Sequence, residues 1–222
     1  MNLPIIDIGI NQTVLAVSTG PDFICALLDT EQVECLGMNT WYQLGHNGIS
    51  NQGRSTGSMG GNLAVLDFGP NKNVKYIKTG EAHGCAILQD DTVKCWGGNG
   101  DGQLGNEDGG YVSVVGNNWS TRGNLNGDAS PIVRLGTGVT ASFLSCGGSH
   151  TCIISHAGEV KCWGGNIYGQ CGSTSEHGAN PNTMGDNLQT VRLVGDGSVA
   201  IHISVGFQHT CELWLALLLG SK

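Results

Sequence analysis

The feature that most constrains this chain is an internal repeat. The segment Thr79 to Gly105 recurs without a gap as Cys146 to Gly172, an offset of 67 residues at every position. A more diverged copy runs from Thr19 to Gly45, and a fourth begins at Val205. A period near 60 residues is longer than that of solenoid repeats and is typical of a β-propeller blade.

Each repeat is predicted to consist of short strands and tight turns. An apolar stretch such as HGCAIL (83–88) precedes a turn, a second stretch TVKCWG (92–97), a glycine-rich loop and a polar insertion. The chain has 37 glycines and no helical periodicity of useful length. The predicted fold is all-β, a partial β-propeller with antiparallel four-stranded blades. Its predicted parts are repeats at about 10–69, 70–136 and 137–195, a partial repeat at 196–222, and residues 1–9 as the outer strand of a preceding or closing blade.

The most specific strings of the repeat identify a family resemblance. HGC or HTC, VKCWGGN and GQLG resemble the repeat of the regulator of chromosome condensation family, whose members form seven-bladed propellers. The resemblance covers nearly the whole chain. The first copy departs from it, with Leu36 where the others have Trp96 and Trp163, and with Tyr42 in place of glycine. The resemblance implies about half of a ring, completed by further blades or by a protein partner.

Six of the nine cysteines form pairs separated by ten residues. If Leu88 to Thr92 makes a hairpin turn, Cys85 faces Cys95 on the neighbouring strand, within the distance that a disulfide accepts. The same spacing occurs in the other repeats. We therefore predict three cross-strand disulfides, Cys25–Cys35, Cys85–Cys95 and Cys152–Cys162.

The remaining cysteines need separate explanations. Cys146 and Cys171 replace Thr and Leu of the other copies, so we expect a bond between these two residues. Cys211 is expected to be unpaired, because Ser221 stands ten residues later.

A metal site is the alternative reading of the cysteines, because His and Cys are two residues apart in His83-x-Cys85, His150-x-Cys152 and His209-x-Cys211. A fourth ligand is missing, and Phe23 replaces the histidine in the first copy. We therefore predict no metal, and expect these histidines to bond the blade backbone.

Other patterns give no catalytic group. The loop Gly97 to Gly110 lacks the residues of a phosphate or calcium loop, so its glycines are expected to serve turns with positive φ. Asp90-Asp91 is expected to form a hairpin turn rather than a catalytic carboxylate pair. No Gly-x-Ser-x-Gly nucleophile elbow and no lone Cys with a partner His stands out. We therefore predict no cofactor and no enzyme.

Aromatic residues divide into packing and binding candidates. Trp96 and Trp163 recur at one blade position, so we expect them to pack between blades. The candidate binding-loop residues are Trp41, Tyr42, Tyr111 and Trp119.

Charge and cysteine content restrict the partner and the compartment. A formal net charge of −8 disfavours nucleic acid, and the longest apolar stretch, Leu213 to Leu219, is too short to span a membrane. No signal peptide is visible, but the cysteine pairs predict a secreted, cell-surface or lumenal location. The sequons at Asn11 and Asn118 are then possible glycosylation sites.

The sequence therefore predicts a noncatalytic protein-interaction scaffold, or a subunit of a larger assembly. The alternatives are a carbohydrate-binding, lectin-like propeller and a guanine-nucleotide exchange factor for a small GTPase, both implied by the family resemblance.

Overall fold

The computed structural model describes residues 6–46, 50–107, 131–191 and 198–216, and regular structure in these ranges is almost entirely β. The helical segments are single 3-10 turns: η1 (Thr56–Ser58), η2 (Gly60–Asn62) and η4 (Gly185–Asn187). Within the described ranges, no helix has the length and apolarity needed to cross a bilayer.

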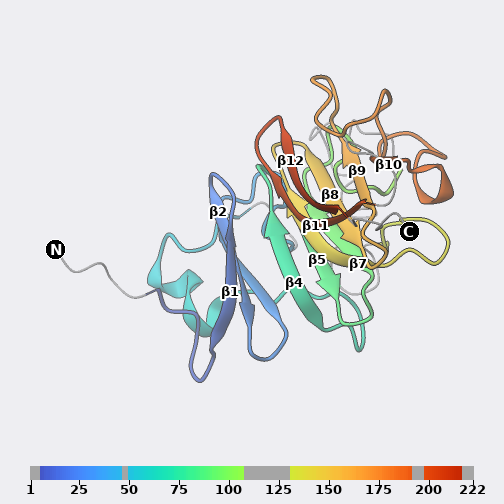
Figure 1. Cartoon of the computed structure of the whole chain (residues 1–222). Helices are drawn as coiled ribbons and strands as arrows, with labels where there is room; N and C mark the ends of the chain where they lie inside the picture. Colours follow the sequence, from blue (N-terminus) through green and yellow to red (C-terminus); the bar gives the residue numbers. More distant parts are fainter. Residues whose placement is uncertain (1–5, 47–49, 108–130, 192–197, 217–222) are drawn as a thin grey trace, which may run out of the picture.

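The strands form four separate antiparallel sheets, one for each repeat, which we call blades 1 to 4 (Figure 1). Blade 1 contains β1 (Val14–Thr19), β2 (Phe23–Leu28) and β3 (Val33–Gly37). Blade 2 contains β4 (Val74–Thr79), β5 (His83–Leu88) and β6 (Val93–Gly97). Blade 3 contains β7 (Ala141–Cys146), β8 (His150–Ser155), β9 (Val160–Gly164) and β10 (Thr190–Val191). Blade 4 contains β11 (Ser198–Val205) and β12 (Thr210–Ala216).

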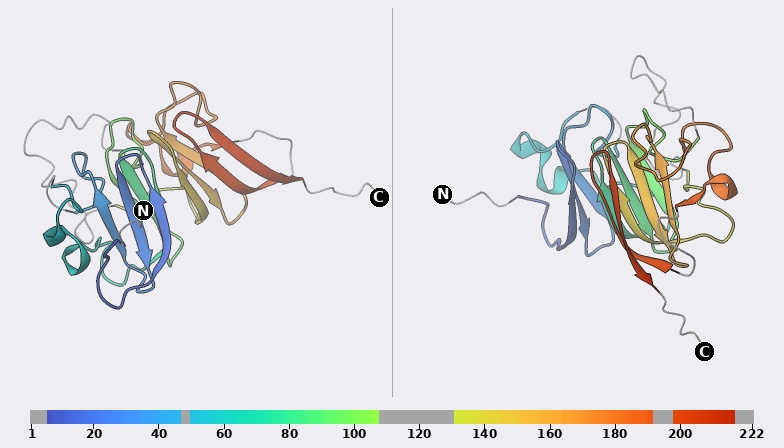
Figure 2. Two further views of the ribbon diagram at one scale, coloured as in Figure 1. Left: turned by 90° about the vertical axis from the view of Figure 1, so that its left-hand side faces the viewer. Right: turned by 45° about the horizontal axis from the view of Figure 1, so that its top comes forward.

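Successive blades pack face to face, as the propeller prediction requires (Figure 2). The first strand of each blade contacts the first two strands of the blade before it: β4 contacts β1 and β2, β7 contacts β4 and β5, and β11 contacts β7 and β8. The four-stranded form holds only for blade 3 within the described residues. In blade 1 the fourth segment is joined to β3 by the Glu34–Val65 bridge, and in blade 2 it is joined to β6 by a hydrogen bond from Val133 N to Val93 O.

The hairpin register follows from the turn that the sequence predicts. Leu88 N donates to Thr92 O at 2.9 Å, and Asp91 adopts a φ of 60° within this turn. Cys85 therefore lies opposite Cys95, and the equivalent pairs face each other in blades 1 and 3. The predicted register is confirmed in all three hairpins.

Three apolar cores fill the interfaces between blades. Neighbouring residues of a strand point to opposite faces of its sheet, so the third strands of blades 2 and 3 each contribute to two cores. Trp96 belongs to the core between blades 1 and 2, whereas its neighbour Cys95 belongs to the core between blades 2 and 3. The prediction that Trp96 and Trp163 pack between blades is therefore confirmed.

The described part of the amino-terminal segment has no strand, in contrast to the prediction for residues 1–9, of which 1–5 lie outside the described residues. Asp7 O accepts a bond from Gly60 N of blade 1 at 2.9 Å. Arg134 O, in the outer segment of blade 2, accepts the equivalent bond from Gly185 N of blade 3 at 2.8 Å. Asp7 thus occupies the place that the outer segment of a preceding blade would take.

Candidate protein-interaction surfaces

The three hairpin cysteine pairs are disulfide-bonded. The S–S distances are 1.99 Å for Cys25–Cys35, 2.10 Å for Cys85–Cys95 and 2.12 Å for Cys152–Cys162, with Cα atoms 4.0–4.1 Å apart. All six residues are buried, and each pair faces the blade that follows its own. Each bond therefore joins the two central strands of a blade beneath the next blade.

The predicted Cys146–Cys171 bond is wrong, because both residues are free and buried. Cys146 lies in the core between blades 2 and 3, where its Sγ donates to Lys78 O at 3.6 Å. Cys171 lies in the core between blades 3 and 4, where its Sγ donates to Gly165 O. The two thiols thus belong to opposite faces of one blade. Burial raises the pKa of each thiol to about 12, so both stay protonated at neutral pH.

His83 and His150 bond the next blade rather than the backbone of their own blade. His83 Nε2 hydrogen-bonds Thr151 Oγ1 at 3.0 Å, and His150 Nε2 does the same with Thr210 Oγ1. Burial lowers the pKa of His83 to about 3, and the neighbouring His150 adds to this effect. Burial likewise lowers the pKa of His150 to about 4, so both imidazoles are neutral at physiological pH.

One group of soft ligands lies at the interface between blades 2 and 3. The ligand atoms of His83, Cys85 and Cys146 lie within 4.8 Å of one another. Cys85 Sγ is already bonded to Cys95, which leaves two ligand atoms for a metal. A structural zinc site takes four ligands, so this group does not fit one while the disulfide is formed.

The loop after each third strand is held by the side-chain amides of one Asn and one Gln, which are buried except for the half-buried Asn166. We call these the Asn–Gln loops: 39–43 in blade 1, 99–103 in blade 2 and 166–170 in blade 3. The Asn Oδ1 accepts from the backbone N five residues later at 2.9–3.0 Å. The Gln Oε1 accepts from the backbone N two residues earlier at 2.7–2.9 Å. Each loop thus carries its own internal bracing.

The Asn–Gln loops of blades 1 and 2 are also anchored to the following blade. Gln43 O accepts a bond from Trp96 Nε1 at 3.0 Å, and Gln103 O accepts one from Trp163 Nε1 at 2.9 Å. The loop glycines have the positive φ expected of them, with values of 98° at Gly97, 81° at Gly102 and 66° at Gly105. The loop tips are therefore displayed in a fixed conformation.

Large apolar side chains project from two of these loop tips. Trp41 is 43% exposed, and at the equivalent place in blade 3 Ile167 and Tyr168 are 77% and 68% exposed. Tyr42 is half-buried and adopts a φ of 59° where the other loops have glycine. Tyr111 and Trp119 lie outside the described residues. The sequence analysis missed Ile167 and Tyr168, although the alignment of the repeats places Tyr168 at the Trp41 position.

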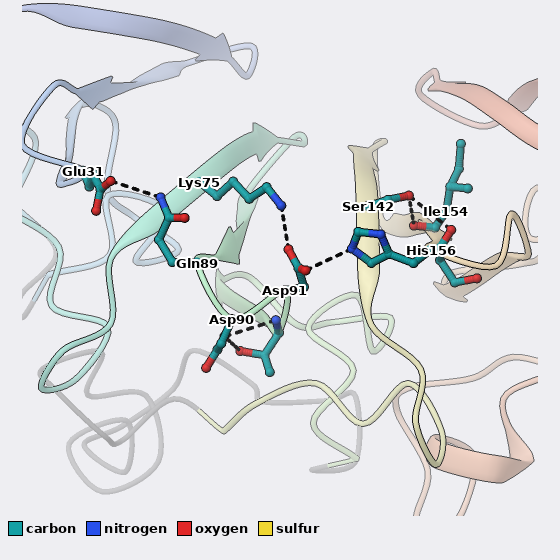
Figure 3. A network of polar contacts seen from close by, with 10 residues as sticks. Glu31, Lys75, Gln89, Asp90, Asp91, Ser142, Ile154 and His156 are labelled. Atoms are coloured by element: carbon teal, nitrogen blue, oxygen red, sulfur yellow. Dashed lines mark hydrogen bonds and ion pairs between the residues drawn. The ribbon is translucent and has the colours of Figure 1, made fainter.

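The opposite ends of the blades carry charged hairpin turns rather than apolar tips (Figure 3). Gln89 Nε2 donates to Glu31 Oε1 at 3.1 Å and so joins blades 1 and 2. Asp91 accepts from Lys75 Nζ at 2.7 Å and pairs with His156 Nε2 at 3.0 Å, which joins blades 2 and 3. This polar network connects three successive blades.

Asp90 and Asp91 are turn residues, as expected. A hydrogen bond from Lys72 lowers the pKa of Asp90 to about 2, and a hydrogen bond from Lys75 lowers that of Asp91. A carboxylic acid that donates a proton needs a raised pKa instead. The pair is therefore suited to holding the turn rather than to acid catalysis.

The two end blades expose faces that interior blades bury. Val17 of blade 1 is 59% exposed, whereas the equivalent Ile77 of blade 2 is 3% exposed. On blade 4, Leu213 and Leu215 are exposed, and Cys211 is a free, exposed thiol as predicted. The sequon residue Asn11 is also exposed, while Asn118 lies outside the described residues.

Comparison with known proteins identifies the repeat. Residues 74–103 and 142–170 match the family model of the regulator of chromosome condensation (RCC1) repeat, and they cover the first three strands and the Asn–Gln loops of blades 2 and 3. Blades 2 and 3 thus match the RCC1 repeat. A curated relative, the probable E3 ubiquitin-protein ligase HERC4 of Rattus norvegicus, is 28% identical over 198 residues, which are 89% of this chain and 16% of that protein. The chain thus spans about a sixth of the length of this relative.

Several solved structures share the fold of this chain. A chain of the complex of Kap60 with yeast RCC1 (Prp20) has a TM-score of 0.64 and 16% identity, covering 91% of this chain and 42% of that chain. Human WBSCR16 has a TM-score of 0.65 and 19% identity, covering 91% and 45%. The ectodomain of the Arabidopsis thaliana receptor kinase ACR4 has a TM-score of 0.50 and 17% identity, covering 93% and 51%. These likenesses establish the propeller fold of the chain.

Proposed function

We propose that this chain is a noncatalytic protein-interaction scaffold of an extracellular or lumenal compartment, and that its Asn–Gln loops contact the partner. The observation that carries the proposal is the fixed display of Trp41, Ile167 and Tyr168 on braced loops. Aromatic side chains held in one conformation lose little entropy on binding and are typical anchors of protein interfaces.

Relatives with the same fold support a protein partner. One solved structure has yeast RCC1 bound to Kap60, and another study concerns the binding of Prp20p to Gsp1p and histones. The acidic charge of this chain makes a basic or neutral protein surface a better match than an acidic one.

The three disulfides support the compartment. Cytosolic glutathione and thioredoxin keep most such thiols reduced, so stable hairpin disulfides favour an oxidising location. Receptor-kinase ectodomains of the same fold are an extracellular precedent for the architecture. Mass spectrometry of the protein from its native source, alkylated without reduction, tests this part. Recovery of all six cysteines as free thiols would contradict it.

The binding role is tested by retention of partners on the immobilised protein after cross-linking. Trp41→Ala and Tyr168→Ala should each weaken partner retention by about tenfold or more, as expected for loss of an aromatic anchor. Val65→Ala, which trims an exposed apolar side chain at the outer rim of blade 1, is the matched control. Equal retention by all three variants would exclude the loop tips as the contact surface.

Carbohydrate binding is the second candidate, because exposed Trp and Tyr rings also stack on sugars. A glycan array probed with the wild type and with Trp41→Ala separates the two functions. Saturable glycan binding that depends on Trp41 would replace the protein-scaffold proposal with a lectin. A nucleotide-release assay on small GTPases tests the exchange-factor alternative in the same way.

A further inference from the structure

We propose that reduction of the Cys85–Cys95 disulfide turns the interface between blades 2 and 3 into a zinc site, with His83, Cys85, Cys95 and Cys146 as its four ligands. The inference goes beyond the proposed function, because it concerns a buried interface rather than the loop tips. It describes the chain after a dithiol or phosphine reductant has cleaved the disulfide. It rests on a set of ligands that this interface has and that its neighbours lack.

Three of the four ligands are already close together. A ring nitrogen of His83 and the sulfurs of Cys85 and Cys146 lie within 4.8 Å of one another. The ligands of a tetrahedral zinc ion lie about 2.0–2.3 Å from the metal, and hence about 3.3–3.8 Å from one another. Shifts of about 1 Å or less therefore bring these three atoms to the spacing that zinc requires.

Cys95 supplies the fourth ligand once its bond to Cys85 is broken. The Cα atoms of these two residues lie 4.0 Å apart, and both side chains belong to the same core as Cys146. On reduction the S–S bond takes up two electrons and two protons, while a dithiol becomes a disulfide or a phosphine becomes its oxide. His83 shares the face of Cys85, because the two residues are two positions apart in β5. Three cysteines and one histidine are a common ligand set of structural zinc sites.

His83 has a lone pair that no other group uses. Thr151 Oγ1 donates its proton to Gln103 O at 3.0 Å, so it accepts from His83 Nε2 and fixes the imidazole proton on that nitrogen. The other nitrogen, Nδ1, is therefore unprotonated, and it is buried without a hydrogen-bond partner. Zinc binds neutral imidazole through either nitrogen. A metal at this place would thus give a partner to a buried polar group that the disulfide-bonded form leaves unpaired.

The two neighbouring interfaces have only part of this ligand set. The place of Cys146, the last residue of β7, is taken by Val205 at the end of β11 and by Thr79 at the end of β4. Between blades 3 and 4 three equivalent ligands remain, which are His150, Cys152 and Cys162. Between blades 1 and 2 two remain, because Phe23 takes the place of the histidine. Of the three interfaces that the structure describes, the middle one alone has all four.

The test measures zinc binding by the whole chain before and after reduction with a phosphine. The disulfide-bonded chain should bind no zinc tightly, whereas the reduced chain should bind one zinc ion and release three protons as its three thiols ionise. In the Cys146→Thr variant, which has the residue of blade 2 at this place, zinc affinity should fall about a hundredfold or more, because one thiolate ligand is lost. Cobalt(II) in place of zinc should give the visible absorption bands of tetrahedral coordination, and its sulfur-to-metal charge-transfer band should weaken in the variant.

Two controls separate a built site from free thiols. Cys171→Leu removes the other buried thiol, restores the residue of blades 1 and 2, and should leave zinc affinity unchanged. In denaturing urea the wild type and Cys146→Thr should bind zinc equally, because unfolded cysteines bind metal without a fixed geometry. Equal affinity of these two proteins in native buffer would overturn the proposal, and so would a reduced chain that unfolds and that zinc does not refold. Trp41→Ala should leave zinc binding unchanged, so this proposal and the proposed function can fail separately.

Discussion

At the inner end of the interface between blades 1 and 2, the ring of Phe23 lies over Gly20, and the hydroxyls of Ser18 and Thr79 bond each other at 2.9 Å. At the same place between blades 2 and 3, His83 lies over Gly80 and bonds Thr151. The position of Thr151 is occupied in blade 2 by Gly84.

The difference shows which parts of the interface the fold fixes and which it leaves free. A close glycine–ring contact is common to both interfaces, with ring carbons 2.5 Å and 2.4 Å from the Cβ positions of Gly20 and Gly80. The residue on the next blade changes together with the ring. Between blades 1 and 2 the apolar ring of Phe23 goes with Gly84, and between blades 2 and 3 the neutral imidazole of His83 goes with Thr151. Buried polar groups therefore change as matched pairs, because an unpaired one would cost the free energy of its desolvation.

The largest expected effect comes from the third-strand residue that faces the preceding blade. Trp163→Ala should lower the free energy of unfolding by about 3–5 kcal/mol, because it leaves a cavity in the core between blades 2 and 3 and removes the indole that donates to Gln103 O. Leu36→Ala at the equivalent place in blade 1 should cost less, because Leu36 is only half-buried. Urea unfolding of the two variants measures the contrast. Equal losses would show that the indole has no special role.

Removal of one hairpin disulfide should have the next largest effect. The double variant Cys85→Ala, Cys95→Ala should lower the free energy of unfolding by about 2–3 kcal/mol, because a short closed loop no longer restricts the unfolded chain. Cys146→Thr, which restores the residue of blade 2 at that position, is the control and should change stability little. If reductant leaves the urea midpoint of the wild type unchanged, the disulfide contributes nothing.

The His83–Thr151 pair should make the second interface sensitive to acid. The unfolded imidazole has a pKa near 6.5, and burial holds that of His83 at about 3, so below pH 6.5 the unfolded chain binds a proton that the folded chain does not. Stability is therefore lost as the pH falls from about 6.5 towards 3.

The blade 1 version of this contact should remove that dependence. The double variant His83→Phe, Thr151→Gly should lose up to about 1.4 kcal/mol less stability per pH unit between pH 6 and pH 4 than the wild type. Urea midpoints at several pH values measure the slopes. Parallel slopes would mean that His83 is protonated in the folded protein.

The smallest effect is expected at the charged turns. Asp91→Asn should lower stability by less than about 1 kcal/mol, because the contacts of Asp91 with Lys75 and His156 are partly exposed to water. The loss should shrink further in high salt, since screening already weakens exposed pairs. A salt-independent loss above 2 kcal/mol would contradict this estimate.

Sequence reasoning was most successful for neighbouring strands of one hairpin, where the position of each residue on one strand fixes its partner on the other. The ten-residue spacing of the cysteines and the two-residue periodicity of a strand gave the hairpin registers and the inter-blade place of Trp96. The Cys146–Cys171 bond was wrong because spacing along the chain does not tell on which face of a blade a residue lies. Tyr168 was missed because its exposure depends on how the braced loop projects from blade 3.

The adjacent positions of Cys95 and Trp96 have a consequence for how a blade reaches its native alignment. A slip of β6 by one residue would turn the Trp96 indole toward blade 3 and the Cys95 sulfur toward blade 1, so Cys85 would have no thiol opposite it and Gln43 O would have no indole donor. The Cys85–Cys95 disulfide can therefore form only in the strand register in which Trp96 is also packed on blade 1. A hairpin with the slipped register has no disulfide, so its strands can still separate and pair again in the native register.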